Sequence, residues 1–168
     1  MGIAKFYAGI GSRETPITLE PSISQIVTEL NSQGYTLRSG GADGADTFFE
    51  RHAIKKEIYL PWRSFNRNNS NLYTLTAEAF ALAEKYHPAW DKLSQAGKKL
   101  MARNCYQILG RDLKSPVDFV VCWTKDGHAS GGTGRALRLA EDLNIPVYNL
   151  YWQDDLLKLP SRIGPNLW

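Results

Sequence analysis

One turn decides how this chain is organised, and it reads Leu37-Arg38-Ser39-Gly40-Gly41-Ala42-Asp43-Gly44-Ala45-Asp46. The apolar run before it is typical of a β-strand, and apolar residues after it recur at the spacing of an amphipathic helix. Glycine has no β-carbon, so a ligand can approach the backbone of such a turn closely. The first N–H groups of a helix lack intrahelical partners and favour negative charge. The stretch therefore predicts either a plain strand-to-helix turn or an anion site.

Two more glycine-rich turns follow predicted strands. The first turn contains Gly9, Gly11, Ser12 and Arg13. The last follows the apolar run at 117–123 and contains Gly131, Gly132, Thr133 and Gly134. Strands are predicted near 6–10, 35–38, 56–60, 117–123 and 146–150, with helices between them and a short helix at 154–159. This alternation predicts a Rossmann-like, three-layer α/β/α fold with a mainly parallel sheet. In such a sheet the turns that leave the carboxyl ends of the strands meet at one edge.

Length and composition indicate one ordinary globular domain over residues 1–168. The chain has 168 residues, 43% hydrophobic and 22% charged, which is enough to bury a core. Its net charge of +3 permits a phosphate-bearing partner without requiring one. Cys105 and Cys122 show no metal-ligand spacing. We find no signal peptide or membrane-spanning run, so we expect a cytoplasmic protein with buried thiols, no metal, no cofactor and no membrane association.

The converging turns predict a site for a nucleotide-type small molecule. The spacing matches neither the dinucleotide-binding fingerprint nor the P-loop, which argues against a dehydrogenase or a P-loop NTPase. Phosphates would bind the turns at 9–13 and 131–134, and residues 39–46 would hold the ribose or a second phosphate. The predicted ligand-binding residues are Gly9, Gly11, Ser12, Arg13, Ser39, Gly40, Gly41, Asp43, Asp46, Trp62, Arg63, Trp123, Thr124, Gly131, Gly132, Thr133, Gly134 and Arg135.

Several of these side chains have a second interpretation. Trp123 could stack on a base or pack in the core. Asp46 and Glu50, four residues apart, could act on a glycosidic bond, but acids in the first turn of a helix also stabilise it. His52 is interpreted as a core histidine, and no catalytic residue is assigned. The basic residues of the helix at 93–108 are typical of a solvated surface; together with others they could instead form a DNA-binding groove of Arg63, Arg67, Lys98, Lys99, Arg103 and Arg111.

The first two turns resemble the signature turns of the DprA/Smf DNA-processing proteins. The matching residues are Tyr7-Ala8-Gly9-Ile10-Gly11-Ser12-Arg13 and Ser39-Gly40-Gly41-Ala42-Asp43-Gly44-Ala45-Asp46, with His52. The third turn, residues 131–134, resembles the phosphate loop of the wider SLOG superfamily, which includes the LOG cytokinin-activating enzymes and the ligand-sensing domain of Thoeris defence proteins. The resemblance covers about residues 3–60 and 117–150. It implies a Rossmann-like fold and a homo-oligomer, and the compact form is similar to DprA-like proteins that phages often carry.

This resemblance implies three alternative functions. The first prediction is a sensor or a sequestering, anti-defence protein that binds a nucleotide or an ADP-ribose-like molecule. The second is a recombination mediator of DprA type that binds single-stranded DNA. The third is a LOG-type hydrolase of nucleotide N-glycosidic bonds. LOG enzymes carry a catalytic glutamate after the glycine turn, whereas here Arg135 follows Gly134 and the next acid is Glu141, which argues against an enzyme.

Overall fold

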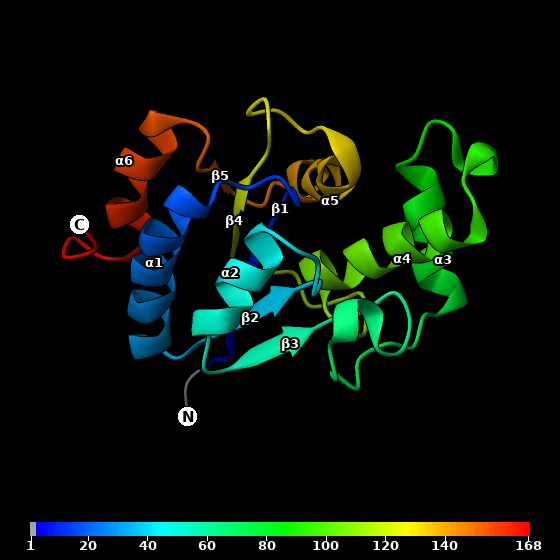
Figure 1. Ribbon diagram of the computed structural model, residues 1–168, viewed down its shortest axis with the longest axis horizontal. Coiled ribbons are helices and arrows are strands. Elements are labelled where there is room, and N and C mark those ends of the chain that lie inside the picture. The colour runs from blue at the N-terminus through cyan, green and yellow to red at the C-terminus, as the bar shows by residue number, and fades with distance from the viewer. Residues whose placement is uncertain (1–2) are drawn as a thin grey trace.

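The structure, a computed structural model, describes residues 3–168 and contains one five-stranded parallel sheet (Figure 1). The strands are β1 (Lys5–Gly11), β2 (Tyr35–Ser39), β3 (Lys56–Ile58), β4 (Phe119–Trp123) and β5 (Val147–Asn149). Their order is β3-β2-β1-β4-β5, and every neighbouring pair is parallel. The predicted Rossmann-like α/β fold is confirmed. The strand order reverses at β1, so the crevice between the carboxyl ends of β1 and β4 is the switch point where open α/β sheets bind ligands.

Helices cover both faces of the sheet. The six helices of the described chain are α1 (Glu20–Ser32), α2 (Ala45–His52), α3 (Ala77–Lys85), α4 (Gln95–Leu109), α5 (Gly131–Asp142) and α6 (Gln153–Ile163). Short 3-10 turns are η1 (Ile17–Leu19), η2 (Phe65–Arg67) and η3 (Trp90–Lys92). Helices α1, α2 and α6 pack on one face, α4 and α5 pack on the other, and α3 packs outside α4 (Figure 1). No helix within residues 3–168 has the length and apolarity needed to cross a membrane.

The alternation of side chains along the central strands builds a core on each face. Tyr7 and Phe119 are register partners on β1 and β4, and their stacked rings lie 5.9 Å apart in the core under α1 and α2. Their chain neighbours Ala8 and Val120 belong to the core under α4 and α5. Because both faces are covered, the central strands β1 and β4 are buried over most of their length and read as nearly continuous apolar runs.

Two elements differ from the sequence prediction. The last helix runs from Gln153 to Ile163 and includes Pro160, whereas the sequence suggested that it ends at residue 159. Leu159 and Ile163 are buried in the core under α1, so packing extends the helix past the proline. The third strand ends at Ile58 rather than at residue 60, although Tyr59 still forms a bridge to Leu72. The crossover from β3 to β4 then includes α3 and α4.

Candidate functional site

The three glycine turns meet at the carboxyl edge of the sheet, and Ser12 joins them. Its N–H donates to the carbonyl oxygen of Trp123, 3.0 Å away at the end of β4. Its own carbonyl oxygen accepts from the N–H of Ala45, 3.3 Å away at the start of α2. These bonds join the first turn to the end of β4 and to the start of α2, and residues of all three turns line one cavity, which confirms the predicted convergence.

A cavity of about 880 Å³ opens at this edge, between the turns after β1 and β4. The turn after β1 contributes residues 10–14, and Thr124, Lys125 and Asp126 follow β4. The start of α5 contributes residues 130–133, whereas Ala42 and Asp46 come from the turn and helix after β2. The opposite wall consists of α4 side chains and Phe65. The volume is within the range of pockets that hold small molecules and cofactors.

The structure brings eight of the eighteen predicted residues into the cavity lining. These are Gly11, Ser12, Arg13, Asp46, Thr124, Gly131, Gly132 and Thr133. The lining does not include Gly9, Ser39, Gly40, Gly41, Asp43, Trp62, Arg63, Trp123, Gly134 or Arg135. Several of these serve the fold: the Ser39 hydroxyl is fully buried and donates to the Gly9 carbonyl oxygen at 2.6 Å. A β-carbon at Gly9 would lie 2.5 Å from the Phe49 ring, so this glycine lets α2 pack against β1.

The third turn has free space around its first two glycines, Gly131 and Gly132, whereas Gly134 packs against the Ala129 backbone. No protein atom lies within 4 Å of the position that a β-carbon of Gly131 would occupy. At Gly132 the nearest atom is Cε of Met101, at 3.7 Å. Both residues begin α5, and the side chain of Ser130 makes no capping hydrogen bond to it. The first N–H groups of α5 therefore border an open cavity, which is the geometry of an anion site.

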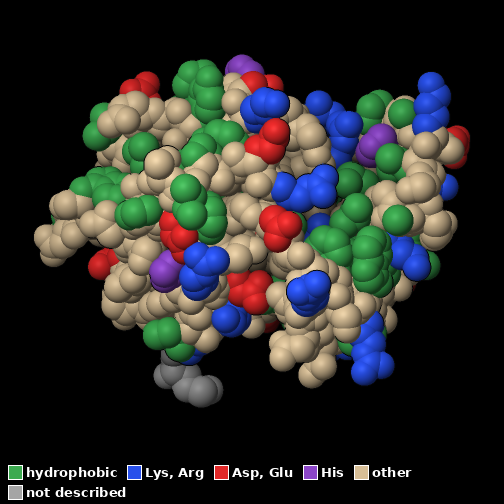
Figure 2. Space-filling view, viewed as in Figure 1, with side chains coloured by type: hydrophobic (Ala, Val, Ile, Leu, Met, Phe, Trp, Pro, Cys, Tyr) green, Lys and Arg blue, Asp and Glu red, His purple; other side chains and the backbone are tan. Residues whose placement is uncertain are grey.

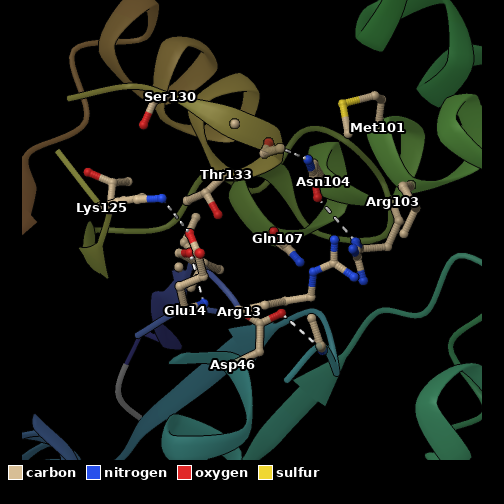
Figure 3. Close-up of a pocket in the computed structure, with 18 of the residues that line it drawn as sticks. Arg13, Glu14, Asp46, Met101, Arg103, Asn104, Gln107, Lys125, Ser130 and Thr133 are labelled. Carbon is tan, nitrogen blue, oxygen red and sulfur yellow. Dashed lines mark hydrogen bonds and ion pairs between the residues drawn. The ribbon is translucent and has the colours of Figure 1, made fainter. Parts of the chain in front are cut away.

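A buried carboxyl group and a buried guanidinium group face the cavity (Figure 3). Asp46 is 4% exposed, and its Oδ2 accepts from the N–H of Ala42 at 3.2 Å. Arg103 on α4 is 5% exposed; its Nη1 donates to the carbonyl oxygens of Gly40 and Tyr59. Burial raises the pKa of Asp46 to about 6, against the opposing effect of the Arg103 charge. Burial likewise lowers the pKa of Arg103 to about 10.

The rim of the cavity carries charges of both signs. Arg13, Glu14 and Lys125 line the cavity and are exposed to solvent, and Lys125 Nζ is 3.6 Å from Glu14 Oε2. The lining as a whole includes three basic residues, Arg13, Arg103 and Lys125, and three acidic ones, Glu14, Asp46 and Asp126. Figure 2 shows acidic and basic side chains interspersed on this face rather than a continuous basic surface.

Sequence reasoning missed the contribution of α4. Arg103 was expected on a solvated helix surface, and this expectation is wrong because its side chain is buried in the cavity wall. Gln107, one turn further along α4, is 3% exposed and also lines the cavity. The available signal was this polar pair four residues apart among apolar neighbours. Of the six basic residues suggested for a DNA groove, Arg103 alone is in the lining, and Arg111 borders a separate small pocket.

Other candidate groups lie elsewhere. His52 is paired with Glu20 on α1, with Nε2 and Oε1 3.2 Å apart. Cys105 and Cys122 are buried free thiols, and burial raises the pKa of Cys105 to about 12. Within residues 3–168 no group of three or more His, Cys, Asp or Glu residues could hold a metal ion.

Comparison with known proteins adds a fold relationship. No protein-family model matches the chain, and no curated protein matches its sequence. A solved structure of DNA processing protein A from Helicobacter pylori, described for its single-stranded DNA binding mode, matches with a TM-score of 0.55 and 20% sequence identity. The match covers 94% of this chain and 72% of that one. The chain therefore has a DprA-like fold, as predicted, whereas a phage origin and an anti-defence role gain no support.

Proposed function

We propose that the chain binds single-stranded DNA and seats one of its nucleotides in the cavity at the carboxyl edge of the sheet. The observation that carries this proposal is the open start of α5, where Gly131 and Gly132 border a cavity of about 880 Å³. Free N–H groups there suit a phosphate, and the volume suits a nucleotide. The H. pylori protein that shares the fold binds single-stranded DNA, which supports the same ligand class here.

The surroundings of the cavity supply the other groups that a single strand requires. Arg13 and Lys125 at the rim can contact phosphates on either side of the seated nucleotide. Phe65 lines the cavity, and the Trp62 ring packs edge-on against it with centroids 5.3 Å apart. Trp62 is 37% exposed, so its ring is available for a neighbouring base to stack on.

Binding of a fluorescently labelled oligo-dT at several salt concentrations tests the proposal. Two phosphate contacts predict a slope of log K against log salt of about −1.4, because each contact to a single strand contributes about −0.7. Arg13→Ala should lower the affinity and bring the slope to about −0.7. Arg51→Ala is the control, since Arg51 lies on α2 and pairs with Glu20 outside the cavity. Failure to bind at any salt concentration, or equal losses in the two variants, would contradict the proposal.

A free nucleotide is the second candidate ligand. The observation that favours it is the balance of three basic and three acidic residues in the lining, which suits a compact ligand better than a long polyanion. Competition by dTMP and by ADP-ribose against labelled oligo-dT separates the two candidates. DNA binding predicts that the oligonucleotide binds at least tenfold more tightly than either competitor, because neighbouring phosphates and bases add contacts. Equal affinities would favour the free nucleotide. Hydrolysis of a nucleotide N-glycosidic bond and formation of a homo-oligomer stay predictions.

A further inference from the structure

Gln107 on α4 is a nearly buried residue whose side-chain amide opens onto the cavity and makes no hydrogen bond within residues 3–168. Its side chain is 3% exposed and lines the cavity from α4. No hydrogen bond joins this amide to any other residue of the described chain, residues 3–168. The amide is not among the fully enclosed unpaired atoms of the described chain, so it is accessible from the cavity, where a ligand group can pair with it.

Three polar side chains converge beside Gly40. A β-carbon at Gly40 would lie 2.0 Å from Nε2 of Gln107, 2.7 Å from Nη1 of Arg103 and 2.8 Å from Oδ2 of Asp46. Only glycine leaves room for all three groups at this position. Figure 3 shows the three side chains directed to the same part of the cavity, from α4 and α2.

The three groups retain unused hydrogen-bonding capacity. Nε and Nη1 of Arg103 donate to Asn104 and Gly40, but Nη2 has no partner within residues 3–168. No ion pair joins Asp46 to Arg103 in that part of the chain, and the Asp46 carboxylate has lone pairs beyond the backbone bonds from Ala42 and Gly11. A ligand that donates to Asp46 and accepts from Arg103 and from the Gln107 N–H groups would satisfy the site.

We propose that Asp46, Arg103 and Gln107 recognise the polar edge of thymine or uracil, a refinement that rests on the proposed DNA binding. The edge of these bases presents a carbonyl, an N–H and a second carbonyl. The two carbonyls accept from Arg103 and the Gln107 amide, while the N–H donates to Asp46. Cytosine presents an amino group where one carbonyl is required, and adenine offers a single ring nitrogen next to its amino group. Neither base has a ring N–H that can donate to Asp46, so both leave a polar group of the site unpaired.

The experiment compares the affinities of the intact chain for four 12-mers: oligo-dT, oligo-dC, oligo-dA and an abasic strand. Wild type should bind oligo-dT at least tenfold more tightly than the other three. Gln107→Leu should remove most of this preference and leave the melting temperature unchanged or higher, because the amide it deletes bonds no described residue. Gln107→Met is the second variant if Leu prevents folding. Gln95→Leu, an exposed glutamine at the start of the same helix, is the control and should retain the preference.

The outcomes separate this inference from the proposed function. No binding of any strand would overturn DNA binding itself. Equal binding of all four strands would leave DNA binding standing and overturn base recognition. A Gln107→Leu variant that loses affinity equally for oligo-dT and oligo-dC would also overturn base recognition, since the amide would then act only on the shape of the cavity.

Discussion

The glycines of the first two turns face protein atoms, whereas Gly131 and Gly132 of the third turn face open space; Gly134, which ends that turn, packs against the Ala129 backbone. A β-carbon at Gly44 would lie 2.4 Å from the carbonyl oxygen of Ser12, and one at Gly9 would lie 2.5 Å from the Phe49 ring. At Gly131 nothing lies within 4 Å, and at Gly132 only Met101 is in ordinary contact. A glycine-rich turn after a strand therefore serves either of two physical roles in this molecule. In one region it allows two segments to pack closely, and in the other it leaves the backbone accessible to a ligand.

Substitution by alanine should separate the two regions most strongly. Gly44 has φ of +80° and would place its β-carbon against backbone that cannot move aside, so we expect Gly44→Ala to lower the free energy of unfolding by about 4 kcal/mol. Gly132→Ala should change it by about 0.5 kcal/mol or less, since the site has room and alanine favours the helix. Urea unfolding of both variants measures the difference. Similar losses in the two would show that the third turn is as tightly packed as the others.

A buried acid in the cavity wall, Asp46 at the start of α2, makes the stability of the chain depend on pH. The pKa of Asp46 rises from 3.8 to about 6 in the native state, so the native state binds more protons than the unfolded chain between these values. The contribution of Asp46 to stability is fully present below about pH 4 and is lost as the pH rises to about 6, a change of roughly 3 kcal/mol.

Unfolding of wild type and Asp46→Asn between pH 4 and 7 measures this effect. Asparagine has no charge to bury, so the variant should lack this loss of stability as the pH rises. The difference in free energy of unfolding between wild type and variant should therefore change by about 3 kcal/mol over that range. Taking the difference removes the acids whose pKa is lowered in the native state, such as Glu20, which stabilise with the opposite dependence. Parallel curves would show that Asp46 is solvated in the native state.

Much of the architecture could be predicted from the sequence because it depends on local patterns. Apolar runs ending in glycine turns, with amphipathic stretches between them, predicted a parallel sheet whose turns meet at one edge. The bonds through Ser12 confirm this. The role of each glycine could not be predicted in the same way, because it depends on which atoms the fold places opposite it. Gly9 and Gly11 have similar local sequence, but only Gly11 lines the cavity.

The wall formed by α4 could not be predicted because it depends on a long crossover. Charged residues on a helix usually face solvent, and nothing local to Arg103 shows that this turn of α4 lies across the ends of the strands. Trp62 and Trp123 were predicted to bind the ligand, but neither lines the cavity. Trp123 instead packs against the core beneath α1, and its ring centroid lies 6.5 Å from that of Tyr151. Packing between segments far apart in the sequence therefore determines the parts of the site that the sequence could not predict.

A charge placed in the open turn gives the smallest of these effects and tests its function directly. Gly132→Asp should fold, because the position has room and a negative charge at the start of a helix is favourable. Its carboxylate would occupy the position proposed for a phosphate and repel it, so the affinity for oligo-dT should fall about tenfold, or about 1.4 kcal/mol. Gly132→Asn is the matched neutral control and should lose less affinity. If the two variants bind equally well, negative charge is not sensed at this turn and the phosphate lies elsewhere in the cavity. If only the aspartate variant loses affinity for oligo-dT and both variants keep their stability, the glycine at position 132 is required for ligand binding and not for packing.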